Sequence, residues 1–294
     1  MNTKTIELIQ PLKESIEQEI DLLLPKESER PSNLHSAMRY SLLNGGKRAR
    51  GVLLLLCARS FPSKYNPLPA AVALECIHAY SLIHDDLPAM DDSPLRRNKP
   101  SCHIAYDEPT AILAGDGLLT EAFKILSEHY NQAPEVALKL INELAKASGS
   151  LGMIAGQQED IENEGQPIDA STLEYIHERK TARLIQAAIN MGFILSDLAS
   201  EKTAYSHALG LHLGMAFQYK DDLLDAQSDA ETLGKPVNSD QAADKLSAVK
   251  VYGLEATQLR ADACLEKAEL SLKNIGGDTT LLGEYVALLS KRDS

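Results

Sequence analysis

Residues 74–103 read LECIHAYSLIHDDLPAMDDSPLRRNKPSCH, an apolar stretch that leads into close carboxylates and then two arginines. A second acidic group, Asp221-Asp222-Leu-Leu-Asp225, lies far along the chain in equally apolar surroundings. Close carboxylates repel one another and are costly to remove from water, so a positive partner should meet them. The first group contains no lysine or arginine, and the second has only Lys220 beside it. Hard divalent cations, completed by the oxygens of a phosphate-bearing substrate, are the simplest partner.

The spacing within each group indicates its geometry. In the second group the outer aspartates are four residues apart and share one helix face, with the middle one about 100° round from the first. In the first group, Asp85 and Asp91 would be separated by roughly 120° on a straight helix. Pro88 disfavours helical geometry just before it and has no backbone N–H. We therefore expect the helix to end or kink there, with a loop that carries Asp91 back towards Asp85.

The rest of the chain favours one all-α bundle over residues 1–294. Helical periodicity dominates, no alternating strand is convincing, and no composition shift marks a second domain. Hydrophobic residues make up 44% of the chain and aromatic residues only 5%, with no Trp, so the core should be aliphatic. Breaks between helices are predicted near Leu24-Pro25, 61–69, 93–100, 132–134, 164–167, 229–236 and Gly276-Gly277.

Composition also limits the possible partners and location. The net charge of −13 and the pI of about 5.1 argue against nucleic acid as a partner. The four cysteines form no CxxC pair, which favours buried free thiols in a reducing cytoplasm over zinc or disulfides. Residues 1–25 show amphipathic helical spacing and no signal peptide, and the strongest apolar run, Val52 to Cys57, is too short to span a bilayer. We expect a soluble, cytoplasmic protein without membrane insertion.

Basic residues gather in short islands that could hold anions. Gly45-Gly46-Lys47-Arg48-Ala-Arg50 precedes the apolar run and suggests a glycine loop that opens a helix, where backbone amides and the helix N-terminus attract an anion. Arg96-Arg97 follows the first acidic group, and guanidinium groups grip phosphate bidentately. Simple pairing of these arginines with nearby aspartates is the alternative. Lys180-Thr181, Lys235 and Lys245 add polar and positive groups in the second half.

Taken together, these motifs resemble the trans-isoprenyl diphosphate synthases, most closely the bacterial short-chain type that makes farnesyl diphosphate. The matching stretches, in the order of that family, are GGKRAR (45–50), residues 74–103, AILAGDGLL (111–119), MIAGQQED (153–160), IHERKTARLI (176–185) and GMAFQYKDDLLDAQSDAETLGKP (214–236). The resemblance implies an all-α homodimer of the isoprenoid synthase type, with a central active-site cavity in each subunit.

The resemblance also implies a role for individual residues. Three Mg²⁺ ions would clamp the allylic diphosphate through Asp85, Asp91 and Asp221, with Asp86, Asp222 and Asp225 as further candidate ligands. The grip on that diphosphate would be completed by Arg96, Lys180, Lys235 and Lys245. The diphosphate of isopentenyl diphosphate would be held by Lys47, Arg50, His78 and Arg97. The reacting carbons would face Thr181 and Gln218, which with Lys180 form the catalytic set. His84 and His103 are treated as residues that either pack or support the site residues.

The implied reaction agrees with this residue set. Breaking an allylic carbon–oxygen bond leaves diphosphate and a carbocation, and metal ions and fixed basic groups stabilise the departing charge. The cation then needs an apolar, water-free cavity with a few oriented dipoles, such as the Thr181 hydroxyl and the Gln218 amide. The double bond of isopentenyl diphosphate attacks the cation and a proton is lost. No nucleophilic serine or cysteine is required.

Product length is predicted from Tyr80, about one and a half helical turns before Asp85. A ring at this position, beside the small Ser81 and with Pro88 and Ala89 inserted in the first acidic motif, accompanies farnesyl products in the family. We therefore expect elongation from dimethylallyl through geranyl to farnesyl diphosphate. The alternative is that Tyr80 only packs in the core, as aromatic residues on apolar helices commonly do, with the cavity floor set elsewhere.

The chain departs from the family pattern at a few positions. Gly51 stands where the family usually has Pro, Ala49 is small, Asn238 replaces a frequent Gly, and the sequence around Lys245 is altered, which puts the contact of Lys245 with diphosphate in doubt. The alternatives are a geranylgeranyl diphosphate synthase, which differs in cavity depth, and a non-catalytic regulatory subunit, which would tend to lose acidic ligands. A terpene cyclase would lack the glycine-basic motif and usually the second aspartate-rich motif.

Overall fold

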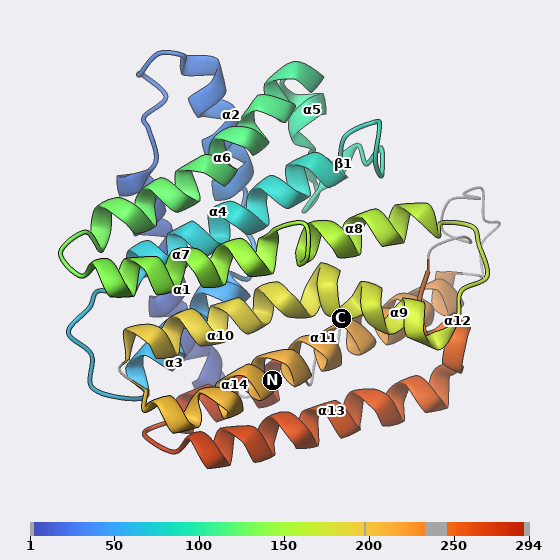
Figure 1. Cartoon of the computed structure of the whole chain (residues 1–294). Coiled ribbons are helices and arrows are strands. Elements are labelled where there is room, and N and C mark those ends of the chain that lie inside the picture. Colours follow the sequence, from blue (N-terminus) through green and yellow to red (C-terminus); the bar gives the residue numbers. More distant parts are fainter. Residues whose placement is uncertain (1–2, 197, 233–245, 291–294) are drawn as a thin grey trace.

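The computed structural model describes residues 3–196, 198–232 and 246–290, which form a bundle of α-helices with one very short hairpin (Figure 1). The elements of the first half are α1 (Thr3–Leu23), α2 (Ser32–Leu43), α3 (Ala49–Arg59), α4 (Leu68–Asp85), β1 (Leu95–Arg96), β2 (Lys99–Pro100), α5 (Cys102–Ala105), α6 (Glu108–His129) and α7 (Pro134–Ser148). The elements of the second half are α8 (Met153–Glu162), α9 (Ala170–Ile176), the π-helical turn η1 (His177–Ala182), α10 (Arg183–Leu195), the 3-10 turn η2 (Ser200–Lys202), α11 (Thr203–Thr232), α12 (Ala248–Tyr252), α13 (Leu254–Ile275) and α14 (Thr280–Ser290). The all-α prediction is therefore confirmed.

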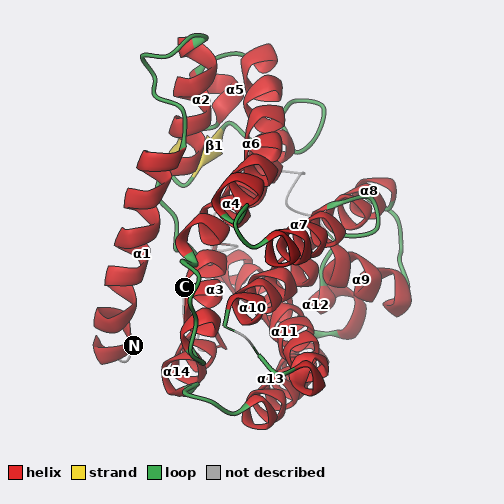
Figure 2. Ribbon diagram, turned by 60° about the vertical axis from the view of Figure 1, so that its left-hand side comes forward, coloured by secondary structure: helices red, strands yellow, loops and turns green. Residues whose placement is uncertain are grey.

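The centre of the bundle is formed by α10 and α11, which Figure 2 shows nearly end on with α3, α7, α13 and α14 around them. Residues Leu184 to Phe193 of α10 are all buried, because this helix packs against α3, α7 and α11 on different sides. A helix that is apolar all round belongs in the interior. The core is mainly Leu, Ile, Val and Ala, as the composition predicted.

The helix ends follow the proline and glycine signals closely. The helix α1 ends at Leu23 before Pro25, α7 begins at Pro134, and α13 ends at Ile275 before Gly276. The predicted break at 93–100 contains a hairpin in which Arg96 pairs with Lys99. Two-residue strands are too short to leave an alternating pattern, so the sequence did not reveal them. The end of the predicted break at 229–236 lies outside the described residues.

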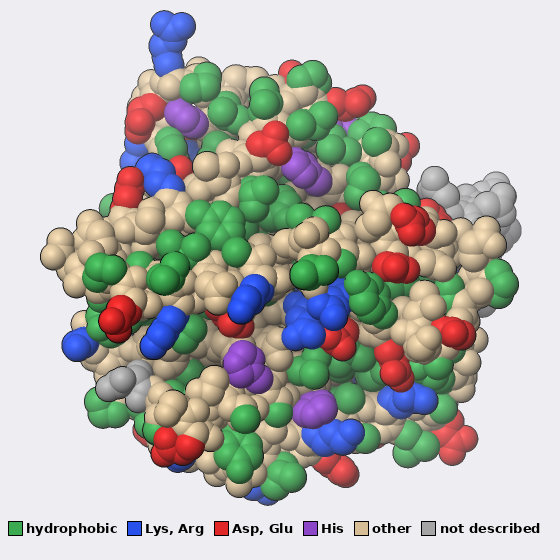
Figure 3. Space-filling view, in the orientation of Figure 1, with side chains coloured by type: hydrophobic (Ala, Val, Ile, Leu, Met, Phe, Trp, Pro, Cys, Tyr) green, Lys and Arg blue, Asp and Glu red, His purple; other side chains and the backbone are tan. Residues whose placement is uncertain are grey.

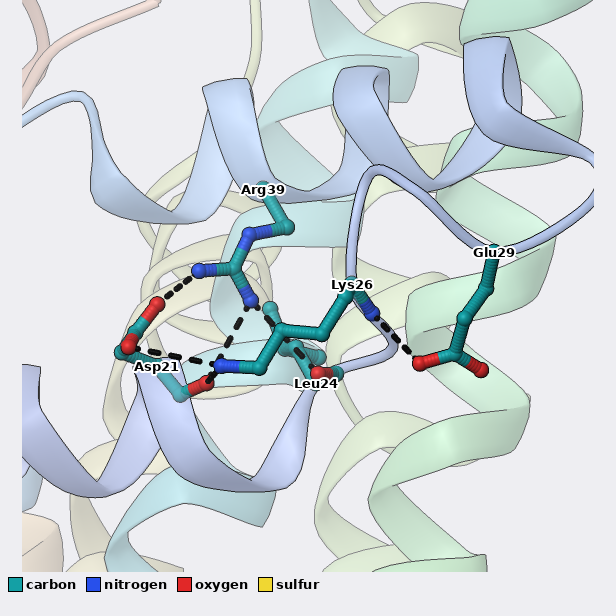
Figure 4. A network of polar contacts seen from close by, with 5 residues as sticks. All are labelled: Asp21, Leu24, Lys26, Glu29 and Arg39. Atoms are coloured by element: carbon teal, nitrogen blue, oxygen red, sulfur yellow. Dashed lines mark hydrogen bonds and ion pairs between the residues drawn. The ribbon is translucent and has the colours of Figure 1, made fainter.

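A polar network fastens the turn after α1 to α2 (Figure 4). The guanidinium of Arg39, itself 8% exposed, pairs with Asp21 and also donates to the carbonyl of Leu24 at 3.5 Å. The backbone N–H of Lys26 donates to Glu29 at 3.0 Å. Hydrogen bonding to Arg39 lowers the pKa of Asp21. This network satisfies the buried arginine and sets where α2 starts.

The four cysteines lie within the described residues and are free thiols, three of them buried. Burial raises the pKa of Cys57 and Cys76, which suits packing rather than reactivity. In the described part of the chain no helix is both long and apolar enough to cross a bilayer.

Candidate active site

The first acidic group lies where α4 ends. The helix stops at Asp85, and the loop over Pro88 returns so that the backbone N–H of Asp91 donates to the carbonyl of Asp85 at 2.9 Å. The predicted return of Asp91 to Asp85 is therefore confirmed. Burial is the main cause that raises the pKa of Asp85 to about 6, with the charge of Lys180 opposing it and the charges of Asp91 and Asp86 adding to it. Asp85 is thus crowded by carboxylates and partly removed from water, whereas Asp91 is exposed.

The second residue of this group points elsewhere. Asp86 is 2% exposed, and the Nε of Arg96 lies 3.1 Å from each of its carboxylate oxygens, with a further contact from Nη2. Hydrogen bonding to Asp86 raises the pKa of Arg96. Asp86 thus fixes the β1 arginine beside the acidic group, so the alternative of pairing with a nearby aspartate holds for Arg96.

The second acidic group lines a cavity between α11, η1 and α12. Asp221 is partly buried, Asp225 is exposed and Asp222 is 5% exposed, as expected if the middle residue faces a different side of the helix. The cavity is also lined by Lys180, Thr181 and Gln218. Three predicted catalytic residues and the whole second acidic group therefore share one hollow.

Lys180 connects the two acidic groups. Its Nζ lies 2.5 Å from the Oδ2 of Asp160 on α8. Burial alone would lower the pKa of Lys180, but Asp160, and then Asp85 and Asp91, raise it. Lys180 lines the cavity of the second group, and its charge lowers the pKa of Asp85 in the first, so both acidic groups are electrostatically coupled to one lysine.

The turn that carries Lys180 is wound as a π-helix from His177 to Ala182. Such turns occur frequently at functional sites. Two glycines let neighbouring helices approach it closely: a Cβ at Gly156 of α8 would lie 2.2 Å from the Lys180 nitrogen, and one at Gly214 of α11 would lie 2.4 Å from the Ala182 Cα. The glycines of the MIAGQQED and GMAFQYK stretches are therefore required by packing around the site.

A chain of hydrogen bonds runs across the cavity wall. The Thr181 hydroxyl donates to the Gln218 Oε1 at 2.7 Å, and the Gln218 Nε2 donates to the Asp222 Oδ1 at 2.8 Å. The backbone N–H of Ala248 donates to the Asp222 Oδ2 at 2.6 Å, and the Nε2 of His177 lies 3.4 Å from the same oxygen. Both oxygens of Asp222 accept from protein donors.

The glycine-basic stretch forms a second, separate polar region. Gly45 and Gly46 adopt φ of 80° and 117°, and α3 begins within the motif at Ala49, so the glycine loop opens a helix as predicted. Arg97 donates to the carbonyl of Gly45, and a Cβ at Gly46 would lie 2.7 Å from the Arg97 Cζ. Lys47 is exposed at this loop. The structure thus brings Arg97 to the glycine loop across a large sequence separation.

His78 joins this region from α4. The Nη1 of Arg50 lies 3.3 Å from the His78 Nε2. Burial, followed by the charges of Arg50, Arg97, Arg48 and Arg96, holds the pKa of His78 well below its ordinary value. The depressed pKa of His78 and the four arginine charges that act on it indicate a locally positive region.

The other arginine of the motif is structural. Arg48 is 3% exposed, donates to the carbonyl of Leu42 at 2.6 Å and lies 3.7 Å from the buried Glu75. Glu75 also accepts from the backbone N–H of Gly51 at 2.9 Å. Proline at position 51 could not donate this hydrogen bond, which gives a physical reason for the departure from the family pattern noted above.

Tyr80 and its neighbours pack against α6. Tyr80 is 5% exposed, its hydroxyl is buried without a hydrogen-bond partner in the structure, and its ring meets that of His84 edge to face at 5.8 Å. His84 sits over Gly115, with its Nε2 3.1 Å from the carbonyl of Ile112, in agreement with the packing role expected for it. The Ser81 hydroxyl donates to the carbonyl of His78 at 2.9 Å.

Among the side chains that the structure describes, no three acidic, His or Cys groups gather into a ready-made metal centre. The donors nevertheless fit Mg²⁺. Asp85 and Asp91 on one side, and Asp221 and Asp225 on the other, offer only carboxylate oxygens, and Mg²⁺ is typically bound by one or two carboxylates together with substrate phosphates and water. Lys235 and Lys245, which the sequence analysis placed at the diphosphate, lie outside the described residues.

Sequence reasoning missed two residues of this site. Asp160 pairs with Lys180, and His177 approaches Asp222. Both stand inside stretches that carried the family resemblance, MIAGQQED and IHERKTARLI, but neither spacing nor periodicity indicates what they contact. A π-helical turn has no recognisable sequence pattern of its own.

Comparisons with known proteins agree with this geometry. A crystal structure of an FPP/GFPP synthase from Zymomonas mobilis superposes with a TM-score of 0.87 at 32% sequence identity, covering 98% of this chain and 100% of that one. A geranyltransferase from Helicobacter pylori, complexed with magnesium and isoprenyl diphosphate, has a TM-score of 0.81 at 34% identity over 98% and 97% of the two chains. The fold and the site define an all-α prenyltransferase.

Sequence comparison narrows this class. The family described as Polyprenyl synthetase matches residues 31–275, and the chain belongs to that family. It is 43% identical over 270 residues to a farnesyl diphosphate synthase of Geobacillus stearothermophilus, covering 90% of each chain. It is 40% identical over 262 residues to geranylgeranyl pyrophosphate synthase 7 of Arabidopsis thaliana, covering 88% of this chain and 75% of the relative. The predicted family is thereby confirmed.

Proposed function

We propose that this protein is a Mg²⁺-dependent prenyltransferase that condenses isopentenyl diphosphate with dimethylallyl and geranyl diphosphate to give farnesyl diphosphate. One observation carries the proposal: Lys180 interacts with the first acidic group while it lines the cavity of the second. A diphosphate between these groups would meet metal ligands on two sides and a fixed cation. The name of the Geobacillus relative supports farnesyl diphosphate as the product.

The allylic diphosphate would bind between the acidic groups. In this proposal Asp85, Asp91 and Asp221 hold three Mg²⁺ ions, with Asp225 assisting. When bound, these ions supply positive charge that stabilises the departing diphosphate. Asp86 holds Arg96 in place beside this site, and Lys180 presents a permanent cation to the same diphosphate. Lys235 and Lys245 are proposed to complete the grip, from the part of the chain that is not described.

The second substrate would bind at the glycine-basic region. Arg50 lies against His78, the charge of Arg97 acts on the same ring, and the exposed Lys47 belongs to the same loop. Such a concentration of arginine favours a diphosphate without metal ions. Two anion sites of different chemistry, one acidic and metal-dependent and one basic, suit a reaction that keeps one diphosphate and releases the other.

The cavity wall would then guide the chemistry. When the allylic carbon–oxygen bond breaks, its electron pair leaves with the diphosphate and positive charge develops on the allylic carbons. Thr181 and Gln218 offer oriented oxygen dipoles at this point. The double bond of isopentenyl diphosphate forms the new carbon–carbon bond, and the proton lost from the adjacent carbon passes to the released diphosphate. Product length is set, in this proposal, by the buried ring of Tyr80, with Ser81 beside it.

We also propose a cytoplasmic homodimer formed by one domain over the whole chain. Large apolar side chains are exposed along α6 to α8, including Leu113, Leu138 at 67% and Leu151 at 77% exposure. Figure 3 shows green apolar side chains gathered over this part of the molecule. A contiguous apolar surface on a protein of this size supports self-association.

One assay tests the proposal against its alternatives. Purified protein is incubated with Mg²⁺, isopentenyl diphosphate and each allylic primer, and the dephosphorylated products are separated by chromatography. Farnesol from dimethylallyl and geranyl primers is the expected result. Geranylgeraniol as the end product would favour the alternative suggested by the Arabidopsis relative. The absence of any product would favour a regulatory subunit, although all the acidic positions are retained here.

A further inference from the structure

In the hydrogen-bond chain from Thr181 to Asp222, the chemistry of the groups fixes which atom donates and which accepts at each step. A carboxylate only accepts hydrogen bonds, and a backbone N–H only donates. Asp222 accepts from the Ala248 N–H through one oxygen and therefore must receive the NH₂ of Gln218 at the other. The amide oxygen of Gln218 is thereby turned towards Thr181, so the Thr181 hydroxyl must donate to it.

We infer that Asp222 is a positioning residue that acts through Gln218 to fix the hydroxyl of Thr181 with its proton turned away from the cavity. The inference rests on the proposed function. Thr181 lines the cavity, so the unshared electron pairs of its oxygen face the region where the allylic cation develops. A hydroxyl turned the other way would direct its positive hydrogen at the cation.

This role differs from metal binding. Asp222 is 5% exposed, and its two oxygens receive Gln218 and Ala248, with His177 3.4 Å from one of them. Donors of the protein thus hold the carboxylate in one orientation. The same carboxylate connects η1, α11 and α12, so it links the wall of the cavity to the start of α12.

The first test is Asp222→Asn. In this variant the Ala248 N–H donates to the side-chain oxygen of the new asparagine, so the asparagine NH₂ faces Gln218. Gln218 must then reverse its amide, and Thr181 receives an N–H instead of donating its proton. Loss of one oriented dipole at developing charge costs about 10²–10³ in turnover in the best-studied cases, and we expect kcat to fall at least about tenfold. The KM for both diphosphates should change far less, because the oxygens of Asp222 accept from Gln218 and Ala248.

The decisive test exchanges the acid and the amide. In Gln218→Glu/Asp222→Asn, the asparagine NH₂ donates to the new carboxylate at 218, which can again accept the Thr181 proton. We expect this double variant to recover about tenfold in kcat over Asp222→Asn alone. The matched control is Gln10→Glu/Glu14→Gln on exposed α1, where the Gln10 Nε2 donates to Glu14 across one turn at 2.9 Å. This control should behave like the wild type.

A further pair shows whether Asp222 acts through Thr181. Thr181→Val removes the hydroxyl with little change in volume, so adding Asp222→Asn to it should lower kcat no further. A full additional loss on the valine background, or no gain from the acid–amide exchange, would overturn the inference.

Thermal unfolding separates this inference from the proposed function. Gln218→Glu alone sets two carboxylates against each other and should lower Tm, and Asp222→Asn should restore it in the double variant. This result is expected even if the wild type makes no prenyl product, an outcome that would refute only the proposed function. A double variant that melts below both single variants would contradict the assigned direction of the chain.

Discussion

The Nη1 of Arg50 lies 3.3 Å from the Nε2 of His78, which makes the partly buried ring an acceptor for a guanidinium that cannot lose its charge. Burial and the surrounding arginines hold the pKa of His78 well below its ordinary value. His78 is therefore neutral in the folded protein near neutral pH. The pocket gains an acceptor for Arg50 without any added negative charge.

This relationship predicts a pH dependence of stability. In the unfolded chain His78 gains a proton as the pH falls through about 6.5, whereas in the folded protein it does not. Because the unfolded state binds more protons, the free energy of unfolding should fall by up to about 1.4 kcal/mol per pH unit below that point. His78→Gln should reduce this slope, as measured by thermal unfolding between pH 7.5 and 5.5. The exposed His129 provides the control: His129→Gln should leave the slope unchanged, and an equally steep slope in His78→Gln would contradict the prediction.

Arg97→Ala should chiefly impair the use of isopentenyl diphosphate. Arg97 donates to the carbonyl of Gly45 and packs on Gly46, so its guanidinium lies at the glycine-basic loop. Loss of a charge-assisted hydrogen bond worth roughly 1.5–3 kcal/mol corresponds to at least about a tenfold higher KM. Steady-state kinetics with each substrate varied in turn measure this. Arg96→Ala is the comparison and should act mainly on the allylic substrate; an Arg97→Ala effect confined to the allylic substrate would reverse our allocation of the two arginines.

Asp85→Asn or Asp221→Asn should reduce turnover by about 10²-fold or more, because each removes a proposed metal ligand that stabilises the departing charge. Chelation of Mg²⁺ from the wild type should abolish turnover. Circular dichroism should show unchanged helix content in every case. Asp92→Asn is a matched control in the same loop, since Asp92 has a φ of 46° that Asn also tolerates. Full activity after substitution of both ligands or after chelation would reject the metal assignment.

The two acidic groups show which features of the site the sequence could predict and which it could not. Proline chemistry sufficed to predict that Asp91 returns to Asp85, and helical angles sufficed to separate Asp222 from Asp221. Neither rule could tell that Asp86 and Asp222 are the buried members, because burial depends on which elements cover each face. The guanidinium of Arg96 pairs with Asp86, and the backbone N–H of Ala248 donates to Asp222.

The limits of the sequence are similar at the basic motif and at η1. The glycines of the motif indicated its loop, but the sequence could not show that Arg48 turns inward to Glu75 while Arg50 turns to His78. That choice follows from contacts with α1 and α4. The π-helical turn at Lys180 depends on the close approach of α8 and α11 through their glycines, a tertiary effect with no local signature.

Gly115→Ala should lower both stability and turnover, although Gly115 is not itself an active-site residue. A Cβ at Gly115 would lie 2.1 Å from the Nε2 of His84, and the ring is tied to α6 by its contact with the carbonyl of Ile112. The ring of His84 must therefore move. Because Asp85 is the next residue, its carboxylate should be displaced as well. Overpacking of this kind costs typically about 1–3 kcal/mol, so Tm and turnover should both fall. Gly117→Ala is the control on the same helix, because its nearest neighbour is the flexible Met38 Sδ at 3.0 Å; equal losses in both variants would show that His84 is not responsible.

Tyr80→Ala should lengthen the products. The ring is buried on α4, faces His84, and lies near enough to Asp85 that burial and this charge raise the pKa of Tyr80 to about 12. Removing the ring opens space below the growing chain, so geranylgeranyl or longer products should appear by chromatography. Tyr80→Phe keeps the ring and removes a buried hydroxyl that has no hydrogen-bond partner in the structure, so it should retain the farnesyl product with equal or higher Tm. If Tyr80→Ala gave the same product profile as the wild type, another residue would set the floor of the cavity, and Tyr80 would be left with the packing role alone.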